Sequence, residues 1–443
     1  MAFSGLDIYK LLPKTNCREC GFATCLAFAM QLAKKNIAID KCPYISADAK
    51  AILESAALAP IKLVTIGRGE NKLEVGNETV MFRHEEKFRF PCGLGVIIED
   101  ALDDLKIKER LNKINQLKFE RVGQVLQVNC VAIRHSGGAG RFESAVKLLL
   151  KNTDLPLVLI SVDAEEMKSA CAIAKDRRPL IYCATKDNLP VFAEIAGRFN
   201  LPLVVSAPDL ESMQELTKEL KVKGLNDLVL DTGKKNISEK IWDLTQMRRQ
   251  ALKKSNRLLG FPALVIAESS DPYEEAIAAS VYIAKYAGIV LISGIDSWEA
   301  LSILTLRQNI YTDPQKPLQI EPKLYTVGSA GRESPVLVTT NFSLSYYTVL
   351  GEVEASKIPS YILSVNTEGM SVLTAWAAEK FNAETITQSL NNCGIKDMVN
   401  HKRVIIPGYV AVMSGDLEEQ SGFQIIVGPK EAAGLPSFLK NLN

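Results

Sequence analysis

The middle of the chain alternates short aliphatic runs with longer amphipathic segments. The runs include GLGVIIED, LPLVLISVD and ALVIAES, and they are followed by segments such as RFESAVKLLLKN, in which apolar residues recur at helical spacing. Continuous apolar runs are typical of parallel strands that are covered on both faces. Eight such runs between residues 93 and 296 predict a (β/α)8 barrel, and an open doubly wound sheet is the alternative.

Different patterns flank this region. Residues 61–90 alternate apolar and polar positions and predict short antiparallel strands. The proline-bearing stretch 311–335 is typical of a semi-rigid linker. After it, four apolar strands each lead into a small polar loop, which predicts a Rossmann-like sheet. The expected α/β organisation is 1–57 as a small module, 58–310 as the barrel with its hairpin, 311–335 as the linker and 336–443 as the last domain.

Four cysteines occupy the first module in the pattern Cys17-x2-Cys20-Gly21-x3-Cys25-x16-Cys42-Pro43. A [4Fe–4S] cluster needs four thiolates, and a close group with a distant Cys-Pro is typical of such sites. Zinc is the competing metal, but structural zinc sites usually show two Cys-x2-Cys pairs and this module has one. Leu26, Ala29, Met30 and Ala33 share a helical face that we expect to cover the cluster.

Composition excludes several functional classes. Lys and Arg total 52 against 51 Asp and Glu, so no overall basic field indicates nucleic acid or an anionic membrane as a partner. The first residues lack the apolar core of a secretory signal, and no apolar run reaches the ~18 residues of a membrane span. Nine cysteines without an export signal favour a reducing cytoplasm and metal ligation.

The material for acid–base or nucleotide chemistry is sparse. The three histidines, His84, His135 and His401, offer little for a hydrolase, and no phosphate loop of the GxxxxGK[ST] type occurs. The glycine-rich segment 137–140 is expected to be a barrel loop, with phosphate binding as a weaker interpretation. Strand ends carry acidic residues that could act in catalysis or cap helices, namely Asp163, Asp209, Asp231, Glu268 and Asp296. No catalytic residue is assigned.

The loops of the last domain form a second pattern. The segments 339–343, 366–371, 407–409 and 428–436 supply hydroxyls, glycines and backbone N–H groups with almost no charge. Such loops would suit a large, flat, amide-rich cofactor better than a triphosphate. Ser, Thr and Gly at these positions also serve as ordinary helix caps, so the pattern alone leaves both interpretations open.

The cysteine motif, the barrel and the last α/β domain together resemble one family over the whole chain: the large subunit of the corrinoid/iron–sulfur protein of the anaerobic acetyl-CoA (Wood–Ljungdahl) pathway. This resemblance implies a methyl-group carrier in which the cobalt of a cobamide accepts methyl from methyltetrahydrofolate through a methyltransferase. The methyl then passes to acetyl-CoA synthase, and the cluster reduces accidentally formed cobalt(II) to cobalt(I). It also implies a heterodimer with a small, barrel-shaped subunit and a C-terminal cobamide site.

The resemblance implies specific cofactor-binding positions. The cluster ligands would be Cys17, Cys20, Cys25 and Cys42. The cobamide contacts would be Thr340, Ser343, Tyr346, Gly369, Met370, Ser371, Val372, Gly408, Gly434 and Pro436. Other cobamide domains carry an Asp-x-His-x-x-Gly motif whose histidine ligates cobalt, and this motif is absent here, so we predict cobalt without a protein histidine ligand.

Two other classes of function remain as hypotheses. One is an electron-transfer protein, in which a cluster module is joined to a flavin- or nucleotide-binding domain. The other is an enzyme whose active site lies in the barrel, with a structural cluster. Whether the chain counts as an enzyme in its own right stays open, since a methyl carrier is a component of a methyltransferase system.

Overall fold

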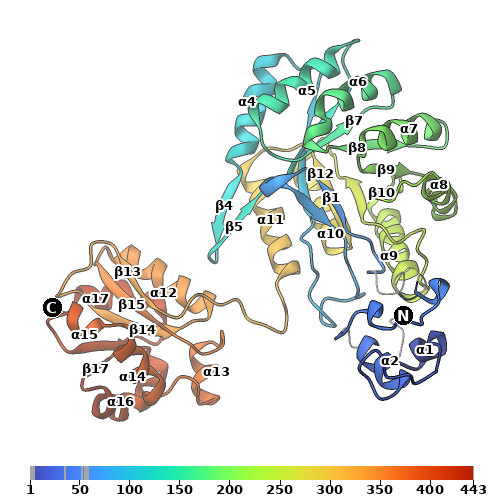
Figure 1. The fold of residues 1–443 in the computed structure, drawn as a ribbon. Helices are drawn as coiled ribbons and strands as arrows, with labels where there is room; N and C mark the ends of the chain where they lie inside the picture. Colours follow the sequence, from blue (N-terminus) through green and yellow to red (C-terminus); the bar gives the residue numbers. More distant parts are fainter. Residues whose placement is uncertain (1–4, 34–35, 51–52, 54–58, 443) are drawn as a thin grey trace. The chain divides into compact units, whose positions relative to one another are not determined.

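The computed structural model describes residues 5–33, 36–50, 53 and 59–442 (Figure 1). The described chain divides into two compact units. One contains the described residues up to Phe119 together with Leu126–Tyr311, and the other contains Glu120–Val125 and the described residues from Thr312 onward. The expected domain boundary at residues 57 and 58 lies outside the described residues. No helix in the described ranges is long and apolar enough to cross a membrane.

Eight parallel strands of the first unit close into a barrel, as predicted. The strand order around the barrel is β10-β11-β12-β3-β6-β7-β8-β9. The strands are β3 (Gly93–Glu99), β6 (Cys130–Arg134), β7 (Leu157–Ile160), β8 (Leu180–Ala184), β9 (Leu203–Ser206), β10 (Leu228–Asp231), β11 (Ala263–Ile266) and β12 (Ala287–Ile292). Their inward side chains, among them Ile97, Val158 and Val229, fill the interior as one apolar core.

Helices follow the strands and lie outside them (Figure 1). They are α4 (Asp104–Gln116), α5 (Arg141–Asn152), α6 (Ala164–Ala174) with the 3-10 turn η3 (Lys175–Arg177), α7 (Leu189–Phe199), α8 (Leu210–Val222), α9 (Ile237–Lys253), α10 (Pro272–Ala284) and α11 (Ser297–Tyr311). Side-chain caps fix several helix starts: Asp163 accepts hydrogen bonds from the second and third amides of α6, and Asp209 does the same for α8. These two acidic residues are therefore caps.

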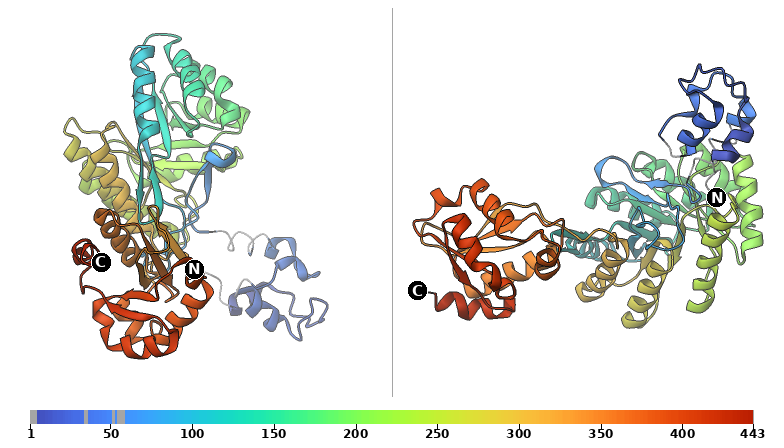
Figure 2. Two further views of the ribbon diagram at one scale, coloured as in Figure 1. Left: turned by 90° about the vertical axis from the view of Figure 1, so that its left-hand side faces the viewer. Right: turned by 90° about the horizontal axis from the view of Figure 1, so that it is seen from below.

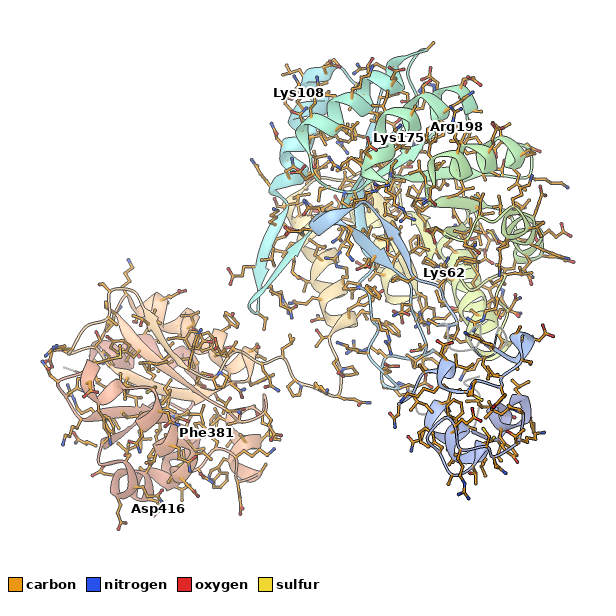
Figure 3. The ribbon with its side chains drawn as sticks, viewed as in Figure 1. Lys62, Lys108, Lys175, Arg198, Phe381 and Asp416 are labelled. Carbon is orange, nitrogen blue, oxygen red and sulfur yellow. The ribbon has the colours of Figure 1, made fainter. Side chains whose placement is uncertain are left out.

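An antiparallel hairpin closes the amino end of the barrel. It consists of β1 (Val64–Ile66) and β2 (Leu73–Val75), joined through η2 (Gly69–Asn71). Leu73 lies so close to Gly93 that a β-carbon there would be 2.7 Å from it. Lys62, labelled in Figure 3, joins the hairpin to the barrel through an ion pair of 3.1 Å with Asp227. Residues 78–84, also expected to be extended, form no strand.

A second hairpin was not anticipated. The segment QVLQVNCVAI was expected to be one strand, but it divides into β5 (Gln124–Gln127) and β6. β5 pairs with β4 (Lys118–Arg121) in a separate two-stranded sheet. Asn129 explains the break, because its amide oxygen accepts a hydrogen bond from Leu94 N at 3.1 Å just before β6 begins.

The C-terminal unit is built on a five-stranded sheet with the order β13-β15-β14-β16-β17. The strands are β13 (Leu324–Val327), β14 (Val336–Thr340), β15 (Ser360–Val365), β16 (Arg403–Ile406) and β17 (Gln424–Val427). The last four are parallel and match the predicted Rossmann-like strands, whereas β13 is an antiparallel edge strand. β13 lies in the stretch expected to be a linker, where its four residues were too short a pattern to stand out.

Helices cover both faces of this sheet (Figure 2). α12 (Ser343–Ser356) and α17 (Leu435–Lys440) pack on one face together with η5 (Ala432–Gly434). The opposite face carries α13 (Val372–Ala377), α14 (Ala383–Asn392), α15 (Ile395–Met398), η4 (Gly408–Met413) and α16 (Ser414–Ser421). Phe381, labelled in Figure 3, is fully buried in this second core.

Candidate functional site

The cysteine module is a small unit of α1 (Gly5–Leu11), α2 (Cys25–Ala33) and η1 (Ile39–Lys41). Cys25 and Cys42 are buried in its apolar cluster, Cys20 is half-buried and Cys17 is exposed. The loop that carries the first two cysteines is wound by left-handed residues, with φ of 59° at Lys14, 47° at Asn16 and 67° at Arg18. Loops of this kind form concave sites for anionic groups, including iron–sulfur clusters.

The four thiols are neighbours but do not converge to ligating distance. Burial raises the pKa of the Cys42 thiol, and the nearby Cys20, Cys25 and Cys17 raise it further. Within the described ranges, no three His, Cys, Asp or Glu side chains come close enough together to hold a metal ion. Cys25 Sγ already accepts a hydrogen bond of 3.4 Å from Asn16 N. The structure therefore gathers the four cysteines in one small module, with Cys25 and Cys42 in its apolar cluster, without bringing three of the thiols together.

The helix after Cys25 buries only part of the face that was predicted, at Ala29. Phe28 and Ala29 are buried beside Cys25, whereas Leu26 and Met30 are 39% and 49% exposed. The orientation of α2 is set by its packing against α1 and by the burial of Cys25. The helical spacing of apolar residues took neither contact into account. Leu26 and Met30 are therefore unsuitable as the cover that was expected.

The C-terminal sheet carries a cavity of about 350 Å³ at the carboxyl ends of its strands. Its floor is formed by β14 and β16, which are adjacent although β15 lies between them in the chain. Such a reversal of strand order opens a crevice in which α/β proteins bind ligands. α12 forms one wall through Leu344 and Thr348, and the loop segment 428–430 forms another. Lys430 is the sole cationic residue among those that line the cavity.

The predicted cobamide contacts lie at or around this cavity. Ser371 and Val372 line it. Gly408 and Gly434 lie beside lining residues, and Pro436 is in the first turn of α17. Thr340, Ser343 and Tyr346 are buried at the end of β14 and the start of α12, while Gly369 and Met370 belong to the loop before α13. Burial raises the pKa of Tyr346, so its phenol stays protonated.

Sequence reasoning missed several lining residues. Thr339, Ser345 and Tyr409 line the cavity and were not chosen. The alternation of side chains along a strand could have identified Thr339. Leu337 faces α12, so Thr339 shares that face and Thr340 points to the other. Helical spacing gives Ser345, because it lies one turn before Val349, another lining residue.

Three hydroxyl groups at this edge of the sheet are buried without a hydrogen-bond partner: Thr339 Oγ1, Thr340 Oγ1 and Ser364 Oγ. Thr339 is 1% exposed and is directly opposite Ser364 in the register of β14 and β15. A buried polar group without a partner costs about 1–3 kcal/mol, so native proteins rarely keep one without a reason. Of the three residues, Thr339 is the one that lines the cavity, so a ligand bound there could give its hydroxyl a partner.

All three histidines are described, and none is among the residues that line the cavity. His401 precedes β16, so it is at the amino end of the sheet. Its Nε2 lies 2.9 Å from Ser334 O, and its Nδ1 accepts a hydrogen bond of 3.2 Å from Arg403 N. His84 stacks on Phe82, and His135 contacts Asp100.

In the barrel, the glycine-rich loop at residues 137–140 is filled by the protein itself. Asp100 is fully buried and accepts hydrogen bonds of 2.7 Å from Ser136 N and Gly137 N. Although burial acts to raise it, hydrogen bonding to His135 and these amides lowers the pKa of Asp100. Gly140 N donates to Glu166. Carboxylates thus occupy the amides of Gly137 and Gly140, which argues against the weaker interpretation of this loop as a phosphate site.

The other charges at the carboxyl end of the barrel also pair with one another. Arg134 forms a bidentate ion pair with Glu268, at 2.8 and 2.7 Å. Asp231 accepts hydrogen bonds from Tyr182 Oη at 2.7 Å and Lys240 Nζ at 2.9 Å. A cavity of about 780 Å³ borders these groups. They are occupied with each other, so they offer no free acid–base pair.

Comparisons with known proteins agree with this arrangement. A family model described as CO dehydrogenase/acetyl-CoA synthase delta subunit matches residues 63–439, and one described as a putative Fe–S cluster matches residues 12–44, which contain all four cysteines of the module. A solved structure of dihydropteroate synthase from Yersinia pestis is 13% identical, covers 49% of this chain and 94% of its own, and has a TM-score of 0.39. A likeness of this extent indicates nothing about function.

Curated relatives match over the full length. The corrinoid/iron–sulfur protein large subunit of Moorella thermoacetica is 43% identical, with 99% of both chains covered. The acetyl-CoA decarbonylase/synthase complex subunit gamma of Methanothermobacter thermautotrophicus is 36% identical, over 100% of this chain and 99% of its own. That of Methanocaldococcus jannaschii is 34% identical, over 99% and 96%. The chain therefore belongs to the family of corrinoid/iron–sulfur protein large subunits and acetyl-CoA decarbonylase/synthase gamma subunits, as its sequence resemblance indicated.

Proposed function

We propose that this chain is a methyl-group carrier that holds a cobamide in the C-terminal cavity and a [4Fe–4S] cluster on Cys17, Cys20, Cys25 and Cys42. The observation that carries the proposal is the cavity at the strand-order reversal, where the unpartnered hydroxyl of Thr339 meets apolar walls. A four-cysteine module in the same chain and full-length relatives named as corrinoid/iron–sulfur proteins support it. A flavin- or nucleotide-binding electron-transfer protein is the less favoured alternative, because no relative named above is described as one.

The residues of the chain have separate roles in this proposal. The cavity walls on α12 and the 428–430 segment would enclose the apolar part of the ligand, and Thr339 would hydrogen-bond to one of its polar groups. When bound, a cobamide would supply a cobalt ion that, in its reduced form, accepts a methyl cation and later releases it. The cysteine module would hold the cluster that restores this reduced form.

The histidine positions support a cobalt site without a protein imidazole. His401 is at the opposite end of its strand from the cavity, and both of its ring nitrogens face main-chain partners. A bound cobalt ion that received no imidazole from the protein would be easier to reduce, which would suit a carrier that must be reactivated. The proposed partners are a small barrel-shaped subunit, a methyltetrahydrofolate methyltransferase and acetyl-CoA synthase, between which the methyl group would move.

The test is anaerobic purification of the chain with its small subunit, followed by absorption spectroscopy and iron analysis. We expect corrinoid bands and about four iron atoms per chain. Cys42→Ala should lose the intact cluster and reductive reactivation but keep most methyl transfer from cobalt that is already reduced. Cys393→Ala is the matched control. Cys393 is the C-cap residue of α14 and has a half-buried thiol, so its substitution should change neither property. Flavin bands, or an iron-only spectrum with catalytic activity, would reject methyl carriage.

A further inference from the structure

The loop between β15 and α13 is held in a strained conformation. Glu368 has φ of 55° and Gly369 has φ of 76°, so two successive residues are left-handed. A residue with a side chain pays a conformational penalty of order 1 kcal/mol or more in this region, and such strain persists only where the surroundings enforce it. The loop leads directly into Ser371 and Val372, which line the cavity. Its shape therefore sets one border of the site.

Asn341 is the residue that enforces this shape. It is 1% exposed and follows β14 directly. Its Oδ1 accepts hydrogen bonds from Thr367 N at 2.9 Å, Thr367 Oγ1 at 3.0 Å and Gly369 N at 3.0 Å. Its main-chain N donates to Val365 O at 2.8 Å, which fixes it against the end of β15. One amide oxygen therefore accepts three hydrogen bonds from the strained loop.

The other side of Asn341 faces a segment that crosses the same strand ends, Leu318–Ile320, here called the strap. Asn341 Nδ2 donates to Gln319 Oε1 at 3.2 Å, and Asn341 O accepts from Ile320 N at 3.0 Å. Leu318 O accepts from Ser343 N at 2.9 Å. A β-carbon on Gly369 would lie 2.6 Å from Gln319 Cγ, so the strap also packs directly on the loop.

We propose that Asn341 is a positioning residue that couples the strap to the strained loop 367–370 and thereby sets the border of the cofactor cavity. This inference rests on the proposed function. The strap begins only six residues after the C-terminal unit starts at Thr312. A displacement of the chain at that point would reach the loop through hydrogen bonds to a single buried side chain. The shape of the C-terminal cavity would then depend on the position of the chain where it enters the C-terminal unit.

Three variants of the complex with the small subunit separate the contacts. Asn341→Ala removes the acceptor of the loop and the donor to the strap. Asn341→Asp keeps an oxygen for the three loop donors and loses the amide hydrogens, which are donated to Gln319 Oε1 of the strap and, at 3.4 Å, to Asn366 Oδ1. Gln319→Ala alters the strap and leaves Asn341 intact. The matched control is Asn382→Ala, which removes the capping box of α14 in the same unit but makes no contact with the loop.

The readouts are hydrogen exchange of residues 366–371, affinity for added cobamide and the absorption spectrum of the bound cobalt(II) form. Asn341→Ala should raise exchange in this segment at least tenfold and weaken cobamide binding at least tenfold, with a shifted spectrum. Asn341→Asp and Gln319→Ala should raise exchange about threefold and keep binding within threefold of the unsubstituted protein. Asn382→Ala should lower thermal stability without changing these three readouts.

The outcomes distinguish this inference from the proposed function. If Asn341→Ala binds cobamide with the affinity and spectrum of Asn382→Ala, Asn341 does not position the site, although the protein is still a carrier. If Gln319→Ala leaves exchange of residues 366–371 unchanged, the strap is not coupled to the loop. If the unsubstituted complex takes up no cobamide, the proposed function fails, whereas the exchange comparison still tests the coupling.

Discussion

The chain contains two sets of parallel strands whose carboxyl ends lead into polar loops, and the two edges differ in how their polar groups are satisfied. In the barrel, Asp100 fills the glycine-rich loop, and Glu268 pairs with Arg134. In the C-terminal sheet, Thr339 lines a cavity with a buried hydroxyl that has no partner. Apart from Glu299, the barrel edge therefore satisfies the polar groups named here, while the C-terminal edge has a hydroxyl left for a ligand.

This difference indicates that the place of a loop in the fold does not by itself decide whether it forms a functional site. Barrel enzymes keep their chemistry at the carboxyl ends of the strands, so the fold alone would place a site there. The charges at that position form closed pairs, and Asp163 and Asp209 cap helices. The smaller sheet has fewer charges but a crevice at its strand-order reversal. Unsatisfied polar groups next to a cavity are thus a better guide to the site than the number of acidic residues.

The largest expected effect concerns the barrel. Asp100→Ala should destabilise the barrel by about 3–5 kcal/mol, because it leaves two buried amides and His135 without their partner. Urea unfolding of the purified complex measures this loss. Cobamide affinity of the folded fraction should stay within about twofold. The control is Asp154→Ala, since Asp154 is 89% exposed and should be neutral. A variant as stable as the unsubstituted protein would show that the barrel edge is not held by internal carboxylates.

A second prediction concerns Glu299, a carboxyl at the barrel edge that lacks the hydrogen bonds by which Asp100 and Glu268 are held. Glu299 is fully buried, its oxygens have no partner of good geometry, and burial followed by the neighbouring Glu275 raises its pKa to about 8. Between about pH 4.5 and 8 the unfolded carboxyl releases its proton while the folded one keeps it. Stability should therefore fall by roughly 2–4 kcal/mol as pH rises through this window and level off above it.

Glu299→Gln should remove that pH dependence, because the amide cannot ionise. Urea midpoints at pH 5, 7 and 9 give the comparison. Glu275 accepts hydrogen bonds from Ser293 N and Gly294 N with one oxygen each, and an amide side chain has a single oxygen, so Glu275→Gln should be destabilising at every pH. Equal pH profiles for Glu299→Gln and the unsubstituted protein would mean that Glu299 is ionised in the folded state and has an ionic partner.

Sequence patterns predicted the eight barrel strands, the four parallel strands of the last unit and the family, since each depends on local apolar runs or on fixed spacing. They were less successful where tertiary packing decides. The buried face of α2 is set by α1, and β13 gains its identity only by pairing with β15. Asn341 looked like one polar residue among several, because its three loop donors lie more than twenty residues away in the chain.

The smallest effect gives the sharpest comparison between the two edges. Thr339→Val replaces an unpartnered buried hydroxyl with a methyl group, so the cobamide-free protein should gain about 1 kcal/mol of stability. If Thr339 bonds the ligand, the same change should weaken cobamide binding about fivefold, equivalent to about 1 kcal/mol. Thr217→Val is the matched control, because Thr217 is an equally buried, unpartnered hydroxyl on α8 of the barrel. It should stabilise the protein without changing cobamide affinity. Equal affinities for both variants would remove Thr339 from the ligand's hydrogen bonds and leave the cavity walls as the main source of binding.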